Sequence, residues 1–134
     1  MKISEELIRR LNEISQMRYP NEACGVLIGN NSNGQVESIW ELENILESTH
    51  NFQIDSFDYL KVEKWAIARG KDIIGFFHSH PNAAAVPSLK DSQYMLPRLN
   101  YIISSVDKTG VRQLKAYRKN SVDEDVTEII YKVG

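Results

Sequence analysis

Cysteine is nearly absent from this chain of 134 residues, in which Cys24 stands alone. A single cysteine excludes an internal disulfide and is typical of a reducing compartment, so we expect a cytoplasmic protein. No apolar run approaches the ~20 residues that a membrane-spanning helix needs. The first residues also lack the apolar stretch and the small-residue cleavage site of a secretory signal peptide. We therefore expect neither a disulfide-rich secreted domain nor contact with a membrane.

Long runs of one charge are missing as well. Lys and Arg number 16 against 18 Asp and Glu, which gives a formal net charge of −2 at pH 7. Nucleic-acid binding proteins carry clustered positive charge, so we expect no nucleic-acid partner. The sequence also has no glycine-rich phosphate loop and no Pro-Cys-x-x-Cys motif. These two absences argue against a nucleotide-binding fold and against a zinc deaminase.

What the sequence does contain is enough for one domain. Its hydrophobic content of 42% and charged content of 25% are ordinary for a globular chain that buries its own core. We find no internal repeat, low-complexity tract or linker. We therefore expect a single domain over residues 1–134.

Apolar periodicity and turn residues predict an α/β protein with a mixed sheet between helices. The expected helices cover residues 4–19, with Ser4 as N-cap, residues 56–69, with Asp55 as N-cap, and residues 89–95. The expected strands cover residues 22–29, 35–46 with a bend or bulge, 52–54, 72–77, 99–106, 111–118 and 126–133. The order of these elements is not a regular βαβ alternation.

Two of these elements have informative faces. In the second helix, Phe57, Leu60, Lys64, Ile67 and Ala68 fall on one face, which is the candidate packing face. The strand over residues 72–77 is apolar on both faces, so we expect it to lie at the centre of the sheet, covered on both sides.

The sequence concentrates its metal-binding side chains in one stretch. That apolar strand is followed directly by His78-Ser79-His80-Pro81. Side chains at positions i and i+2 of a strand point to the same face, so both imidazoles can reach one point. Asp91 follows after a segment with two prolines, and a loop that folds back would bring it to the same place. Three protein ligands are typical of a catalytic zinc site, which keeps its fourth position for water.

Asp91 has a second interpretation. Ser88-Leu89-Lys90-Asp91 has the spacing of a capping box, in which both polar residues only begin a short helix. An Asp91 that turns toward the histidines is not expected to reach back to the Ser88 amide. The two interpretations therefore exclude each other, and spacing alone does not decide between them.

Four other polar residues need an interpretation. A hydrolytic zinc site requires a base, and Glu22 is a candidate because it opens an apolar strand, although a solvated loop residue would give the same pattern. Cys24 lies inside an apolar run, which favours inert packing over a thiol nucleophile. His50 lies in a polar loop, where exposure is expected and a substrate contact is the lesser alternative. Ser79 should point away from the metal, toward a supporting hydrogen bond.

Together these residues resemble the signature of the JAMM (MPN-plus) metalloproteases. That signature contains a glutamate, a distant His-x-His-Pro, and then a serine and an aspartate at fixed spacing. Here residues 81–87 separate His80 from Ser88, two residues separate Ser88 from Asp91, and every position is filled. The segments Asn21-Glu22-Ala23-Cys24-Gly25 and Phe52-Gln53-Ile54-Asp55 also resemble the family.

The resemblance implies a fold and a set of roles. The fold would be one MPN/JAMM-like α/β domain, with a curved mixed sheet flanked by helices and a layering like that of cytidine deaminases. His78, His80 and Asp91 would bind one catalytic Zn²⁺. Glu22 would act as general base and proton shuttle, and Ser88 would help to hold the oxyanion.

The resemblance also implies a substrate. Family members hydrolyse the peptide or isopeptide bond after the C-terminal Gly-Gly of ubiquitin or of a ubiquitin-like protein. This short chain resembles the small stand-alone prokaryotic members, which trim or release ubiquitin-like sulfur carriers. The Ala83-Ala84-Ala85-Val86 segment carries no visible means of gripping such a substrate, and a homodimer is left open.

Two alternatives have other functions. A non-catalytic MPN-type interaction module would be expected to lack metal ligands, and none is missing here. A relative of the RadC group, which is linked to DNA repair, shares the His-x-His-Pro loop, but the acidic charge balance and the surroundings of Glu22 argue against it.

Overall fold

The computed structural model describes residues 1–134 as eight strands and three helices. The helices are α1 (Glu5–Arg18), α2 (Ser56–Ala68) and α3 (Leu89–Tyr94). The strands are β1 (Lys2–Ile3), β2 (Cys24–Asn30), β3 (Gln35–Leu42), β4 (Asp72–Pro81), β5 (Asn100–Asp107), β6 (Gly110–Arg118), β7 (Thr127–Ile129) and β8 (Lys132–Val133). None of the helices has the length and hydropathy needed to cross a bilayer. The predicted α/β class is confirmed.

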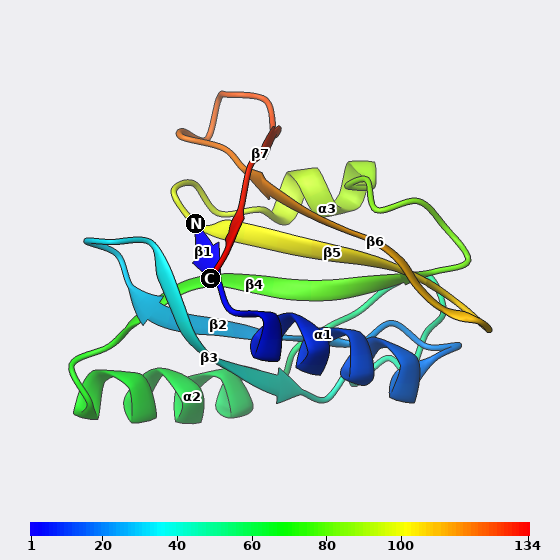
Figure 1. Ribbon diagram of the computed structural model, residues 1–134, viewed down its shortest axis with the longest axis horizontal. Coiled ribbons are helices and arrows are strands. Elements are labelled where there is room, and N and C mark those ends of the chain that lie inside the picture. Colours follow the sequence, from blue (N-terminus) through cyan, green and yellow to red (C-terminus); the bar gives the residue numbers. More distant parts are fainter.

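All eight strands form one mixed sheet with the order β7-β6-β5-β4-β2-β3-β1-β8. Strand β4 lies at its centre, as predicted. It is antiparallel to β2 and parallel to β5. The two edge strands, β7 and β8, are separated by only two residues of chain, so the sheet must curl until its edges approach each other. In Figure 1 the two chain ends lie side by side, and β1 pairs with β8 there.

Helix α1 covers one face of the curled sheet. Ser4 is its N-cap and accepts a hydrogen bond from the Leu7 N–H at 3.2 Å, as its sequence predicted. Leu11 and Ile14 are buried in a cluster of 11 apolar residues that reaches across the sheet. Burial of each such side chain contributes about 1.5–3 kcal/mol, so this cluster is the largest single apolar contribution to stability.

Helices α2 and α3 cover the opposite face, where the apolar packing is divided. Val62 and Ala66 of α2 belong to one cluster of 5 buried residues, and a second cluster of 5 lies beside α3. Phe76 of β4 contacts both clusters. The site described below lies on this divided face.

The packing face of α2 differs from the candidate face. Phe57 is 77% exposed and Ile67 is 67% exposed, whereas Val62 and Ala66 are buried. Both sides of the helix carry apolar residues, so helical spacing could not select the side that meets the sheet. The candidate face, Phe57 to Ala68, was therefore wrong.

Three strand predictions also need correction. The strand expected over residues 35–46 ends at Leu42, although its predicted bulge is present where β3 pairs with Ile28 and Gly29. Residues 52–54 form no strand. The strand expected over residues 126–133 is two short strands at opposite edges of the sheet, because the curled sheet brings both edges within reach.

Candidate active site

The two histidines lie at the carboxyl end of β4, which continues beyond residue 77 to Pro81. Because they are two residues apart, both rings project toward the face that α2 and α3 cover, and their Nε2 atoms are 3.1 Å apart. His78 is buried, and the Phe52 ring stacks on it with 4.6 Å between the ring centroids. Strand periodicity predicted the pairing of the histidines, but nothing in the sequence indicated the stacking of Phe52.

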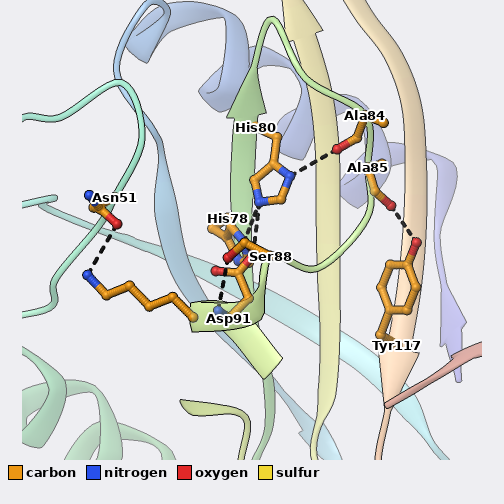
Figure 2. A network of polar contacts seen from close by, with 9 residues as sticks. Asn51, His78, His80, Ala84, Ala85, Ser88, Asp91 and Tyr117 are labelled. Atoms are coloured by element: carbon orange, nitrogen blue, oxygen red, sulfur yellow. Dashed lines mark hydrogen bonds and ion pairs between the residues drawn. The ribbon is translucent and has the colours of Figure 1, made fainter. Parts of the chain in front are cut away.

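Asp91 brings a carboxylate oxygen to the same point from α3 (Figure 2). Its Oδ2 lies 3.2 Å from His78 Nε2 and 3.0 Å from His80 Nε2. The same oxygen accepts a hydrogen bond from the Ser88 N–H at 2.9 Å. Asp91 thus completes the capping box and also faces the histidines. Our expectation that the two roles exclude each other was wrong, because one carboxylate oxygen has two lone pairs.

Ser88 is the N-cap of α3, beside this cluster. Its Oγ accepts a hydrogen bond from the Asp91 N–H at 3.0 Å. Because the oxygen acts there as acceptor, the hydroxyl hydrogen of Ser88 remains free to donate. The structure therefore combines the capping role with an available donor next to the histidines.

Glu22 approaches the histidines from the segment that precedes β2. It is 4% exposed, and one of its carboxylate oxygens lies with His78 and His80 ring nitrogens in a group whose atoms are all within 4.8 Å of one another. Ser79 fixes the neighbouring residue, because its Oγ accepts from the Ala23 N–H at 2.7 Å and its own N–H donates to the Ala23 carbonyl at 3.0 Å. Ser79 thus points away from the histidines and makes the supporting bond that we expected.

The environment of Glu22 changes its acidity. Burial raises the pKa of Glu22 to about 7; the positive charge of His80 lowers it, and the nearby Asp91 raises it. A carboxyl group with a pKa near neutrality is suited to accept a proton and to release it again. The alternative of a solvated loop residue is excluded, because the side chain is buried.

The donor atoms have the spacing that a metal ion requires. Zinc bonds of about 2.0–2.2 Å in a tetrahedron place ligand atoms about 3.3–3.6 Å apart, a few tenths of an ångström more than the 3.0–3.2 Å among His78, His80 and Asp91. The His80 Nδ1–H donates to the Ala84 carbonyl at 3.0 Å, so a neutral ring turns its Nε2 lone pair toward Asp91. Two facing lone pairs require a proton or a metal ion between them. The three residues fit zinc, and Glu22 with the two histidines is a second candidate set.

The protonation states of Asp91 and His78 agree with metal binding. Burial alone would raise the pKa of Asp91, but hydrogen bonds with His78 and His80 hold it well below its usual value, so the carboxylate is ionised. Burial lowers the pKa of His78, which favours the neutral imidazole. For His80, burial acts to lower the pKa, but hydrogen bonds to Asp91 and Ala84 raise it. An ionised carboxylate and a neutral imidazole are the forms that bind zinc.

A cavity of about 520 Å³ opens beside this cluster, with His78 and Asp91 in its wall. Much of its lining is apolar and comes from the segment before α2, from β4 and β5, and from the end of α3: Leu46, Phe52, Ile54, Phe76, Tyr94, Met95, Leu96 and Tyr101. Lys90 and Asn51 are joined by a 3.2 Å hydrogen bond at its wall (Figure 2). The exposed His50 also lines the cavity, so its contact with a substrate stays a prediction.

Sequence reasoning missed this cavity. Its lining residues are scattered from Leu46 to Tyr101 along the chain, and most of its apolar members lie outside the signature that contains His78 and Asp91. The one available signal was the apolar Phe52-Gln53-Ile54 segment, which we assigned to a strand.

Cys24 takes no part in the site. Its side chain is fully buried, and its Sγ donates to the Leu42 carbonyl at 3.5 Å. Burial raises the pKa of Cys24 to about 12, and a thiol that stays protonated is not a nucleophile. The interpretation as inert packing is confirmed.

Comparison with known proteins agrees with this geometry. Residues 4–118 match the family described as prokaryotic homologs of the JAB domain. The chain is 30% identical over 129 residues to the CysO-cysteine peptidase of Mycobacterium tuberculosis, covering 94% of this chain and 86% of the relative. It is 31% identical over 90 residues to the desampylase of Haloferax volcanii, covering 66% of this chain and 65% of that relative.

Solved structures extend the similarity to the fold. A solution structure of a protein from Desulfitobacterium hafniense matches with a TM-score of 0.86 at 26% identity, over 99% of this chain and 92% of that one. A JAB1/MPN domain protein from Archaeoglobus fulgidus matches with a TM-score of 0.65 at 21% identity, over 100% and 97% of the two chains. The chain therefore belongs to the prokaryotic JAB family, within the JAMM metallopeptidases.

Proposed function

We propose that this protein is a zinc-dependent peptidase that hydrolyses the amide bond after the C-terminal Gly-Gly of a ubiquitin-like or sulfur-carrier protein. The observation that carries the proposal is the convergence of His78, His80 and Asp91, with ligand atoms 3.0–3.2 Å apart, beside the buried carboxylate of Glu22. The substrate class follows from the relatives, which are named CysO-cysteine peptidase and desampylase.

In this proposal His78 Nε2, His80 Nε2 and Asp91 Oδ2 hold one zinc ion. When bound, zinc supplies Lewis-acid chemistry: it activates water as a nucleophile at neutral pH and polarises a carbonyl oxygen. Asp91 is held for this task by the Ser88 amide, and His80 by the Ala84 carbonyl. Such supporting bonds orient the ligands and keep their lone pairs directed inward.

Glu22 and Ser88 act on the substrate. Glu22 accepts the proton of the attacking water and delivers it to the leaving amine, a task that suits a pKa of about 7. Ser88 donates its free hydroxyl hydrogen to the negative charge that develops on the carbonyl oxygen. Both side chains belong to the chain itself, so each role can be removed by one substitution.

The apolar cavity beside His78 and Asp91 receives the substrate tail that precedes the scissile bond. Its volume of about 520 Å³ lies in the range of ordinary ligand pockets, about 300–1,000 Å³. An apolar side chain upstream of the two glycines suits the apolar lining of the cavity. We place this activity in the cytoplasm, where a protein with one buried cysteine stays reduced.

The test is incubation of the zinc-loaded protein with a panel of carrier proteins that end in Gly-Gly followed by one amino acid, or in Gly-Gly joined to a lysine side chain. Mass spectrometry of the products should show carriers that end in Gly-Gly. Glu22→Gln is the matched control, because it changes one atom of the proposed base; it should retain zinc and lose about 10²–10⁴-fold in rate. Zinc binding without cleavage of any panel member would favour a non-catalytic interaction module instead.

A further inference from the structure

The segment Ala83-Ala84-Ala85 lies between His80 and Asp91 in the chain. Its side chains offer no polar group, yet each of its backbone carbonyls accepts a hydrogen bond. The Ala83 carbonyl accepts from Ser105 Oγ at 2.5 Å, and the Ala84 carbonyl accepts from the His80 ring at 3.0 Å. The Ala85 carbonyl accepts a hydrogen bond from the Tyr117 hydroxyl (Figure 2). Three successive carbonyls are thus each bound by a different side chain.

The three donors come from neighbouring strands of the sheet. His80 on β4 pairs directly with Ser105 on β5, and Tyr117 lies on β6, which is antiparallel to β5. All three project toward the face that carries the ligand cluster. The segment therefore lies across three strands and is bound by one side chain from each. This explains how residues of little chemical character keep one backbone conformation.

The geometry has a consequence for His80 and Asp91. The His80 ring keeps its Nε2 lone pair directed at Asp91 only while the Ala84 carbonyl accepts from Nδ1. The Ala84 carbonyl also accepts from the Val86 N–H at 2.9 Å. Its orientation depends in addition on the peptide planes on either side, which Ser105 and Tyr117 hold. The same segment continues through Pro87 into the N-terminus of α3, so its conformation also determines the position of Asp91 relative to the histidines.

We propose that Tyr117, with Ser105 in support, is a positioning residue of the metal centre, which it controls through the Ala83-Ala84-Ala85 backbone. The proposal rests on the proposed assignment of His80 and Asp91 as zinc ligands. Tyr117 carries the larger share, because it is 6% exposed and binds the fully buried Ala85. Ser105 is half-buried, so water can replace part of its bond.

The test compares zinc affinity in Tyr117→Phe and Tyr101→Phe. Both residues are buried tyrosines of the cluster beside α3, and each makes one hydrogen bond to the backbone. Tyr101, however, accepts from the Leu96 N–H and does not touch the alanine segment. Both phenylalanine variants keep the ring and its packing, so loss of folding is not expected from either.

Competition with a chelator should give a dissociation constant for zinc that is about 10–100-fold larger in Tyr117→Phe. This is the usual loss of metal affinity when a residue that supports a ligand is removed. Tyr101→Phe should stay within about twofold of the parent chain, and Ser105→Ala should fall between the two. In the zinc-loaded proteins, the His80 Nδ1–H that donates to Ala84 should exchange with solvent slowly in Tyr101→Phe and faster in Tyr117→Phe, which ¹H–¹⁵N spectra of the ring measure. Should Tyr117→Phe not fold, Ser105→Ala carries the same comparison.

Equal zinc affinity and equal exchange of the His80 Nδ1–H in Tyr117→Phe and Tyr101→Phe would overturn the proposal and leave Tyr117 as a core residue. This outcome is separable from failure of the proposed function, because neither measurement uses hydrolysis. If the parent chain binds zinc and cleaves no carrier, the role of Tyr117 can still be measured through zinc affinity.

Discussion

The two faces of the sheet are built differently. On the α1 face, 11 buried apolar residues form one continuous cluster. On the opposite face, two clusters of 5 residues are separate, and the ligand cluster and the cavity of about 520 Å³ lie on the same side of the sheet. The α1 face is filled with apolar side chains, whereas the opposite face contains a cavity beside the little-exposed polar residues of the ligand cluster.

This difference indicates a division of labour. The continuous cluster is the largest single source of hydrophobic stabilisation, so the other face can hold Glu22, His78, His80 and Asp91 in low exposure at a cost to stability. If the division is correct, substitutions on the ligand face should change metal binding or catalysis with little loss of fold. Substitutions on the α1 face should do the reverse.

The largest effect is expected from His80→Ala. The parent chain should bind about one zinc, and the variant should lose zinc and hydrolysis together, because only two of the three proposed ligands remain. Metal analysis after dialysis, with thermal unfolding of the metal-free proteins, checks this. His50→Ala is the matched control: this exposed histidine lines the cavity without a ligand contact, and its variant should keep zinc. Full zinc retention in His80→Ala would refute the ligand assignment.

The next largest effect is expected on the α1 face. Leu11 is 1% exposed in the continuous cluster, so Leu11→Ala should lower the free energy of unfolding by about 2–5 kcal/mol. The folded fraction should bind zinc with unchanged affinity. Urea denaturation and chelator competition on the same samples measure both quantities. A large loss of zinc affinity in folded Leu11→Ala would show that the two faces are not separable.

A smaller effect should follow removal of the Ser88 hydroxyl. Ser88→Ala should lower kcat about 10²-fold through loss of the oxyanion donor, and stability by about 1 kcal/mol through loss of the N-cap. Ser88→Thr keeps both the hydroxyl and the cap, so it should recover most of the rate. Steady-state kinetics and denaturation separate the two roles; a normal kcat in Ser88→Ala would leave Ser88 as a cap only.

The smallest effect concerns pH and stability. In the metal-free protein the pKa of Glu22 rises from 4.5 to about 7 on folding, so between these values the native chain holds a proton that the unfolded chain has lost. The free energy of unfolding therefore decreases as pH rises through this window.

Glu22→Gln removes this dependence. One pKa unit corresponds to about 1.4 kcal/mol, reduced here for partial solvent access. The free energy of unfolding of metal-free Glu22→Gln, relative to that of the parent chain, should therefore rise by about 2 kcal/mol between pH 4 and pH 8. Urea denaturation at the two pH values measures the change. A constant difference between the two proteins would contradict the raised pKa.

Local rules predicted much of the fold and of the site. Capping residues gave the starts of all three helices, and strand alternation placed His78 and His80 on one side of β4. The two-residue spacing of the histidines is a property of any strand, so no tertiary information was needed for it.

The errors arose where tertiary structure decides. Phe57 and Val62 lie on different sides of α2, and only the position of the sheet determines which side is buried. Asp91 could not be assigned from spacing, since one oxygen accepts from Ser88 and also faces the histidines. The role of Ala85 is invisible in sequence, because it resides in a backbone carbonyl that Tyr117 reaches from a distant strand.

The most direct test of the central claim is the coordination sphere of the zinc-loaded protein, determined by crystallography at the zinc absorption edge. The account predicts one zinc bound by His78 Nε2, His80 Nε2 and Asp91 Oδ2 at about 2.0–2.2 Å, with the Glu22 carboxylate outside bonding distance. A zinc ion bound by Glu22 in place of Asp91 would contradict it, because the proposed base would then be a ligand.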